Sequence, residues 1–165
     1  MNKINVTYEE LSLPKLYEKF SSDIFKYSFS ILKHYEEAQD AVQEVFVKFA
    51  ETEHSFKKEC SQKSWLLIIA RSYCYNKIKS KSFNCERIED DTFTPSYTID
   101  YETKMTIRDA LQQLSEEHNE LIYLKDYSGY SYKEISEITK LSVENVKIKL
   151  FRARLQLKKY LIDEL

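Results

Sequence analysis

The chain has 165 residues, of which 42% are hydrophobic and 32% charged, with one Gly, two Pro and a formal net charge of −2. This length allows one ordinary domain or two small ones, and the apolar content excludes a wholly disordered chain. The single Gly excludes nucleotide-binding folds, which need several glycines near phosphate. The shortage of Gly and Pro also favours helices. The nearly balanced charge gives no overall sign of a nucleic-acid or membrane partner.

No segment reaches the roughly 18 consecutive apolar residues of a membrane span. The polar stretch 1–10 lacks the apolar core of a secretion signal. Cys60, Cys74 and Cys85 are odd in number and form no C-x-x-C pair, which is typical of reduced intracellular thiols. The sequence therefore predicts a cytoplasmic protein.

The first predicted domain covers residues 1–82 and consists of amphipathic helices. Apolar side chains recur there every three or four residues, as on one face of a helix. The stripes are Leu16, Phe20, Ile24, Tyr27 and Ile31, then Val42, Val45, Phe46 and Phe49, then Trp65, Leu66, Ile69, Ala70 and Tyr73. No long alternation of period two competes, so the expected fold class is all-α.

Two charged surfaces lie on these helices. Around residues 40–46 the apolar side is expected to be buried, which leaves an acidic stripe that by itself is typical of a solvated surface. The stripe consists of Glu36, Glu37, Asp40, Gln43, Glu44 and Glu51. The helix of residues 64–81 has a basic and aromatic second half with Arg71, Tyr73, Tyr75, Asn76 and Lys77. Cations and rings together suit single-stranded nucleic acid, although a buried aromatic helix with a solvated end fits equally well.

The helical period breaks between the two halves of the chain. Residues 85–103 contain Pro95, several Ser and Thr, and one Arg against six acidic residues. Such a composition is typical of a flexible connector. We therefore expect an acidic flexible linker over residues 83–104 and a second small helical domain over residues 105–165.

The second domain carries a helix-turn-helix pattern. Gly129 suits the end of a helix, where a positive φ is needed. Ser131 and Glu134 fit a capping box that begins a short helix, and Ser142 is a suitable N-cap for a longer one. The turn between the two helices is expected at residues 139–141.

The longer helix has two unlike sides on a helical wheel. Val146, Leu150, Ala153 and Leu157 form the expected core seam. The opposite side mixes polar, basic and large apolar residues, namely Glu144, Asn145, Ile148, Phe151 and Arg152, flanked by Lys147 and Lys149. This surface suits a DNA major groove, where cations meet phosphate and other groups read base edges and thymine methyls. The alternative is a solvated helix whose Phe151 packs on a neighbour.

The order of these elements resembles the extracytoplasmic-function (ECF) group of bacterial sigma factors, which direct RNA polymerase to promoters. Residues 40–46, DAVQEVF, are similar to that family's D-L-V-Q-E-T-F, and Trp65-Leu66 with Ile69-Ala70-Arg71 to its W-L-x-x-I-A-R. Residues 129–135, GYSYKEI, resemble G-x-S-Y-x-E-I, and residues 151–154, FRAR, resemble H-R-A-R. The resemblance covers residues 9–82 and 105–161 and implies a sigma region 2 bundle followed by a sigma region 4 helix-turn-helix.

The resemblance also implies which residues meet which partner. The clamp helices of the largest subunit of core RNA polymerase would contact Asp40, Gln43, Glu44 and Phe46, and the polymerase flap is a further expected partner site. The −10 promoter element, with one base flipped out of its strand, would contact Phe56, Lys57, Lys58, Ser64, Arg71, Ser72, Tyr75, Asn76 and Lys79. The −35 element would contact Asn145, Lys147, Ile148, Phe151 and Arg152. An anti-sigma factor or other recruiting protein is a common partner in the family, and no cofactor or metal is expected.

Four positions depart from the family pattern. Ser72 replaces Asn among the expected −10 contacts, and Glu144 replaces a common Gly. Ser115 replaces a helix-starting Pro and can serve as an N-cap. Lys140 replaces the Gly of the turn, where a positive φ costs about 1 kcal/mol in other residues.

Two other classes of function fit part of the sequence. A stand-alone helix-turn-helix regulator explains residues 105–165 but gives the first domain no role. A zinc module or thiol switch would use His34, His54, His118 and the three cysteines, yet no pair has ligand spacing, and Cys is more often a small buried apolar residue. No residue pair suits catalysis, so we expect no enzymatic activity.

Overall fold

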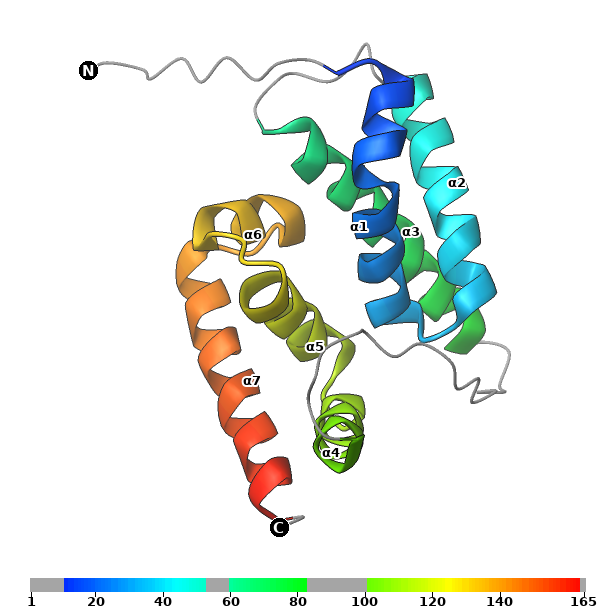
Figure 1. The fold of residues 1–165 in the computed structure, drawn as a ribbon. Coiled ribbons are helices and arrows are strands. Elements are labelled where there is room, and N and C mark those ends of the chain that lie inside the picture. Colours follow the sequence, from blue (N-terminus) through cyan, green and yellow to red (C-terminus); the bar gives the residue numbers. More distant parts are fainter. Residues whose placement is uncertain (1–10, 53–59, 83–100, 164–165) are drawn as a thin grey trace, which may run out of the picture.

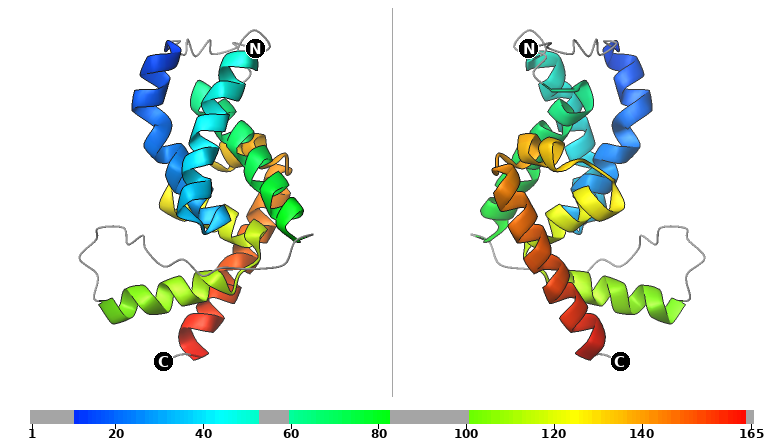
Figure 2. Two further views of the ribbon diagram at one scale, coloured as in Figure 1. Left: turned by 90° about the vertical axis from the view of Figure 1, so that its right-hand side faces the viewer. Right: turned by 90° about the vertical axis from the view of Figure 1, so that its left-hand side faces the viewer.

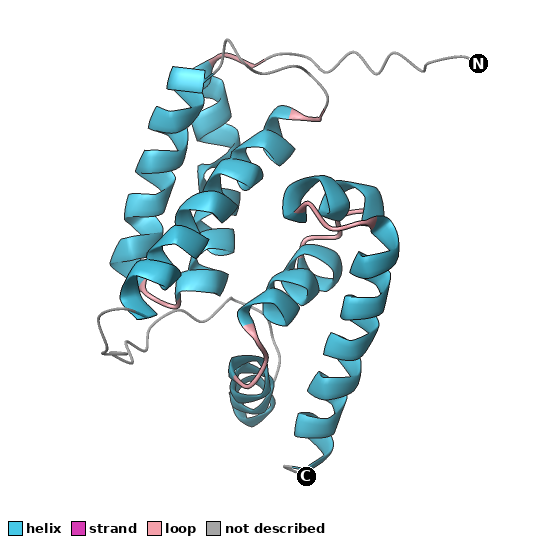
Figure 3. Cartoon of the chain, turned by 180° about the vertical axis from the view of Figure 1, so that it is seen from behind, coloured by secondary structure: helices cyan, strands magenta, loops and turns pink. Residues whose placement is uncertain are grey.

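The computed structural model describes residues 11–52, 60–82 and 101–163, and every regular element in these ranges is helical (Figure 1, Figure 3). The helices of the first half are α1 (Leu13–Leu32), α2 (Tyr35–Thr52) and α3 (Gln62–Ser82). Those of the second half are α4 (Tyr101–Gln112), α5 (Glu116–Ile122), the π-helix η2 (Tyr123–Tyr127), α6 (Tyr132–Thr139) and α7 (Val143–Asp163). The prediction of an all-α fold in two small domains is therefore confirmed.

The first domain is a three-helix bundle. α1 and α2 form a hairpin, and α3 packs against both of them (Figure 1). Its core comes from the predicted apolar stripes, in which Leu16, Ile24, Tyr27, Val45, Phe49 and Leu66 are all 0% exposed. Burying a side chain of this size contributes about 1.5–3 kcal/mol, which offsets the conformational entropy lost on folding. The buried stripes decide which side of each helix is left for a partner.

The second domain packs α7 against α4, α5 and α6 (Figure 2). Ser115 is the N-cap of α5, as predicted, and its side chain accepts a hydrogen bond from the His118 N–H at 3.3 Å. α5 runs directly into η2, where the Ser128 N–H donates to the Tyr123 carbonyl at 2.9 Å. Nothing in the sequence pattern predicts this π-helix. Gly129 follows it with a φ of 74°, as its place in the turn requires.

The predicted helix-turn-helix is confirmed at each of its boundaries. The Ser131 side chain accepts from the Glu134 N–H at 3.2 Å, and the Glu134 carboxylate accepts from the Ser131 N–H at 2.8 Å, which completes the capping box. Lys140 ends α6 with a φ of 62°. The Ser142 side chain accepts from the Asn145 N–H at 3.2 Å where α7 begins. A lysine therefore occupies a left-handed position that favours glycine.

Replacing Lys140 by Gly is expected to stabilise the second domain by about 0.5–1 kcal/mol. Residues other than Gly lose about 1–2 kcal/mol in the left-handed region, and the greater freedom of Gly in the unfolded chain cancels part of the gain. The measurement is the thermal unfolding midpoint, followed by circular dichroism. The matched control, Lys133→Gly on the exposed side of α6, should lower the midpoint because Gly costs about 1 kcal/mol inside a helix. A lower midpoint for Lys140→Gly would contradict this account.

The two domains lie against each other, an arrangement that no sequence pattern predicts. α5 packs beside α1, and α6 packs beside α3 (Figure 1, Figure 2). α4 begins at Tyr101, so the helical part of the second domain starts inside residues 83–104, which were expected to form the linker. The rest of that segment, residues 83–100, lies outside the described residues.

Candidate functional site

α2 separates an exposed acidic side from a buried apolar side. Asp40, Gln43 and Glu44 are all exposed and follow one another at helical spacing, so the three predicted docking side chains share one surface. Phe46 does not belong to it. Phe46 is only 6% exposed, and its ring meets the Tyr17 ring edge-on with 4.9 Å between centroids. The prediction of a partner contact by Phe46 therefore does not fit the structure, in which this residue holds α2 against the core.

The structure describes only part of the predicted −10 surface. Phe56, Lys57 and Lys58 lie outside the described residues. Ser64 is 1% exposed in the first turn of α3, where its N–H donates to the Ser61 hydroxyl at 3.0 Å. The predicted DNA contact by Ser64 is therefore corrected: α3 begins at Gln62, two residues before the helix expected from residue 64, and Ser64 lies buried in its first turn.

Farther along α3 the structure brings the other predicted residues together. Ser72, Asn76 and Lys79 are exposed at helical spacing. Arg71 and Tyr75 form the neighbouring stripe and are half-buried. The Arg71 guanidinium lies over the Tyr75 ring, 4.5 Å from its centroid. A cation stacked on a ring, beside amide and hydroxyl groups, suits unstacked nucleotides.

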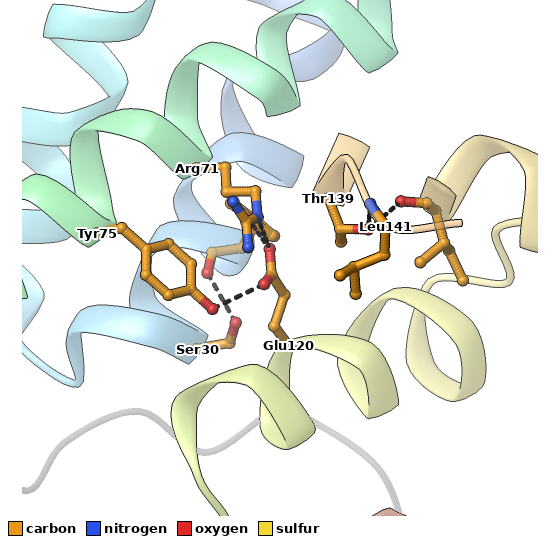
Figure 4. A network of polar contacts seen from close by, with 8 residues as sticks. Ser30, Arg71, Tyr75, Glu120, Thr139 and Leu141 are labelled. Carbon is orange, nitrogen blue, oxygen red and sulfur yellow. Dashed lines mark hydrogen bonds and ion pairs between the residues drawn. The ribbon is translucent and has the colours of Figure 1, made fainter. Parts of the chain in front are cut away.

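Arg71 and Tyr75 already have a partner in the second domain (Figure 4). Glu120 on α5 accepts from Arg71 Nε at 2.9 Å, from the Tyr75 hydroxyl at 2.7 Å and from the Tyr27 hydroxyl at 2.6 Å. Burial and the Glu120 carboxylate raise the pKa of both phenols. Burial alone would lower the pKa of Arg71, but the carboxylate more than offsets this and raises it. All three donors therefore keep their protons at physiological pH.

α7 exposes the predicted −35 surface. Asn145, Lys147, Ile148, Phe151 and Arg152 are all exposed, and the core seam on the opposite side is largely buried. Phe151 is 63% exposed and therefore does not pack on a neighbouring element. This excludes the alternative in which α7 is a solvated helix with Phe151 packed on a neighbour. Large apolar side chains gathered on a surface mark a site of interaction.

Two cations of α7 are used inside the second domain. Lys149 Nζ lies 2.6 Å from the Glu117 carboxylate of α5. Arg154 forms a two-pronged ion pair with Asp126 of η2, in which Nε lies 3.1 Å from the carboxylate. Both ion pairs hold α7 in place, so Lys149 and Arg154 are not included among the expected DNA contacts. Lys147 and Arg152 are the basic residues of the predicted −35 surface itself.

The residues that sequence reasoning missed lie where the two domains meet. Glu120 is one of them, and its neighbour Asn119 donates to the Ser30 carbonyl at 2.9 Å. Lys63 lies 5.4 Å from the centroid of the Tyr130 ring. The only signal in the sequence is a charged residue beside the apolar pair at 121–122, which does not identify its partners.

The cysteines and histidines do not gather into a site within the described residues. No group of three His, Cys, Asp or Glu side chains there is arranged to hold a metal ion. Cys74 is buried, and this burial raises the pKa of its thiol to about 12, so it is protonated and unreactive at neutral pH. Cys60 is half-buried, while Cys85 and His54 lie outside the described ranges. None of the helices in these ranges is both long and apolar enough to cross a membrane.

Both halves of the chain match models of one protein family. Residues 16–83 match Sigma-70 region 2, and residues 104–157 match Sigma-70, region 4. The chain is 32% identical over 157 residues to RNA polymerase sigma factor YlaC of Bacillus subtilis, covering 90% of this chain and 91% of that protein. It is 24% identical over 158 residues to ECF RNA polymerase sigma factor SigX of the same organism, covering 88% and 81%.

Two solved structures share the fold. A chain in the co-crystal structure of the sigma factor RpoE with the anti-sigma factor NepR from Bartonella quintana gives a TM-score of 0.77 at 23% identity, covering 90% of this chain and 95% of that one. A chain in the structure of CnrH with the cytosolic domain of CnrY gives a TM-score of 0.70 at 18% identity, covering 93% and 89%. At these identities the likeness concerns the fold alone.

Proposed function

The chain belongs to the extracytoplasmic-function group of RNA polymerase sigma factors, and from this membership we propose which of its surfaces binds which partner. It binds core RNA polymerase and directs transcription initiation at promoters with −10 and −35 elements. In this proposal α2 docks on the polymerase, α3 holds the −10 element and α7 enters the major groove of the −35 element. The energy comes from binding, and the chain itself catalyses no reaction.

The two-sided character of α2 carries the docking proposal. The buried side fixes the helix in the bundle, so Asp40, Gln43 and Glu44 are presented on a preorganised surface. Two carboxylates and an amide suit a basic partner surface rich in hydrogen-bond donors. Such a surface on the clamp helices of core polymerase is the proposed contact.

The DNA contacts follow from the chemistry of the two exposed surfaces. On α3 the stacked pair of Arg71 and Tyr75 supplies a cation and a ring, which suit a strand whose base has been flipped out of the duplex. On α7 the amide of Asn145 and the guanidinium of Arg152 read base edges, while Phe151 contacts thymine methyl groups. Capture of the flipped base then helps to melt the DNA between the two elements.

Changing Asp40, Gln43 and Glu44 together to alanine is expected to raise the Kd for core RNA polymerase by about 100-fold or more. Central interface residues commonly contribute about 2 kcal/mol or more each, and their loss is not additive. The substitution should leave the fold intact because all three side chains are exposed. The measurement is complex formation with purified core polymerase, followed by fluorescence anisotropy of the labelled sigma factor.

The matched control for this variant removes the same net charge elsewhere. Glu18 on α1 and Glu144 on α7 are both exposed and lie outside the acidic stripe of α2. The variant Glu18→Ala with Glu144→Ala should bind core polymerase as the wild type does. Equal affinities for the control and the triple variant would refute the assignment of the docking surface.

The proposed partners also determine where the protein acts. Core polymerase and promoter DNA lie in the cytoplasm, which is therefore the proposed place of action. We also include an anti-sigma factor or other recruiting protein among the partners, as RpoE has NepR in its co-crystal structure. A stand-alone helix-turn-helix regulator is not favoured, because both halves of the chain match the sigma family.

A further inference from the structure

Glu120 is the only charged residue in the buried part of the described structure, and it is 0% exposed. It belongs to the second domain, yet the three side chains that donate to it, Tyr27, Arg71 and Tyr75, all belong to the first. Figure 4 shows Arg71 and Tyr75 beside Glu120. A buried carboxylate is tolerated only when it is paired and hydrogen-bonded. The buried position of Glu120 therefore depends on contact with the first domain.

The groups that hold Glu120 are also suited to a nucleic-acid phosphate. A phosphate, like a carboxylate, is an anion that accepts hydrogen bonds from guanidinium and hydroxyl groups. Arg71 and Tyr75 lie in the stripe beside the exposed Ser72 and Asn76. The Glu120 carboxylate takes the Nε–H of Arg71 at 2.9 Å, offsets the positive charge of the guanidinium and repels a second anion beside it. Glu120 and DNA therefore compete for Arg71.

The rest of the contact between the domains combines polar pairs with aromatic packing, in which the Tyr27 ring meets the Tyr123 ring edge-on with 6.0 Å between centroids. It includes the bond from Asn119 to the Ser30 carbonyl and the position of Lys63 over the Tyr130 ring. A cavity of about 150 Å³ lies between the domains and is lined by residues of α1, α3 and η2. An interface between two domains of one chain commonly allows relative motion unless it is large and hydrophobic. A buried ion pair at such an interface is a suitable switch, because removing one partner is costly while the intact pair adds little net stability.

We infer that Glu120 is an autoinhibitory latch, which in the unbound chain closes the second domain onto the first and occupies Arg71 and Tyr75. The inference rests on the proposed role of α3 in binding the −10 strand. Opening releases both side chains for DNA and returns the Glu120 carboxylate to water. Closure and DNA binding oppose each other, and by linkage each weakens the other by the same factor.

The test compares the full-length chain with its Glu120→Gln variant. Glutamine keeps the size of the side chain but removes the charge that pairs with Arg71, so the closed arrangement loses its ion pair. The radius of gyration, measured by small-angle X-ray scattering, should increase. The affinity for a labelled single-stranded DNA oligonucleotide of mixed sequence should rise by about 10-fold, as expected if about a tenth of the wild-type chain is open.

Three further variants isolate the role of the latch. Glu18→Gln neutralises an exposed carboxylate on α1 in place of the buried one, so it should alter neither measurement. Tyr27→Phe removes one donor to Glu120 from the first domain and should also open the chain and strengthen DNA binding. Adding Arg71→Ala to Glu120→Gln should keep the chain open but remove the gain in DNA affinity.

The outcomes separate the latch from the proposed function. The latch is overturned if Glu120→Gln and Tyr27→Phe remain as compact as the wild type, or if they open without binding DNA more tightly. Circular dichroism checks that Glu120→Gln keeps its helices. If Glu120→Gln loses them, the compactness and DNA affinity of Tyr27→Phe are the test of the latch. Failure of the latch alone leaves binding to core polymerase intact. If the proposed function is wrong, neither the wild type nor any variant should bind polymerase or DNA. That result would overturn the latch as well.

Discussion

Changing Phe151 and Arg152 together to alanine is expected to lower transcription from a −35-dependent promoter by about 100-fold. A guanidinium that reads a base edge contributes about 1–3 kcal/mol of discrimination, and an aromatic anchor commonly contributes a similar amount. A joint loss of about 3 kcal/mol corresponds to a factor of about 100. The measurement is run-off transcription by reconstituted holoenzyme on a promoter selected with the wild-type protein. Both side chains are exposed, so the fold should be preserved.

The matched control removes one cation and one apolar side chain farther along α7. Lys159 and Ile162 are exposed near the end of this helix, about 10–15 Å beyond the pair that is expected to read the DNA. Lys159→Ala with Ile162→Ala should lower transcription by less than about 5-fold, because at most one phosphate contact is lost. Both double variants should bind core polymerase normally. If the control loses as much transcription as the first variant, the −35 surface has been placed on the wrong part of α7.

The parts of the fold that depend on local sequence could be predicted. The starts of α5, α6 and α7 follow from Ser115, Ser131 and Ser142, because an N-cap acts on an N–H only three residues away. The buried and exposed sides of α2 and α7 follow from helical periodicity alone. The candidate docking and −35 surfaces were therefore accessible from the sequence.

The contact between the domains could not be predicted, because it joins residues that are far apart in the chain. Glu120 meets Tyr27, Arg71 and Tyr75 at sequence separations of 93, 49 and 45 residues. A periodic pattern within one helix contains no information at that range. The family motif identifies Arg71 as a cation on α3, but it does not identify the carboxylate that this cation meets.

Two site residues were misplaced for a different reason. A family motif contains residues that contact partners together with residues that shape the helix. Phe46 ends the motif of α2 but lies on its core side, and Ser64 precedes the Trp-Leu pair but lies in the first turn of α3. For Phe46, helical periodicity distinguishes a core residue from a contact residue, because Phe46 also belongs to the predicted apolar stripe. For Ser64 the position of the helix start decides, and helix boundaries are the least certain feature of a sequence pattern.

Changing Phe49 to alanine is expected to lower the free energy of unfolding of the first domain by about 3–5 kcal/mol. Phe49 is 0% exposed on the inner side of α2, so its loss leaves a cavity in the bundle core. Small domains have about 5–15 kcal/mol of stability in total, and the variant should lose a large part of it. The measurement is urea unfolding followed by the fluorescence of Trp65, which is the single tryptophan of the chain and lies in α3.

The functional consequence of Phe49→Ala separates stability from recognition. Binding to core polymerase should weaken near the unfolding temperature of the variant and recover on cooling, because the docking side chains are unchanged. The triple alanine variant of the docking surface should bind poorly at every temperature. Val47 supplies the control, since it lies on the same helix but is 55% exposed, and Val47→Ala should change stability by less than about 0.5 kcal/mol. If Phe49→Ala and Val47→Ala were equally stable, α2 could not be anchored by its apolar side, and the preorganised docking surface would lose its physical basis.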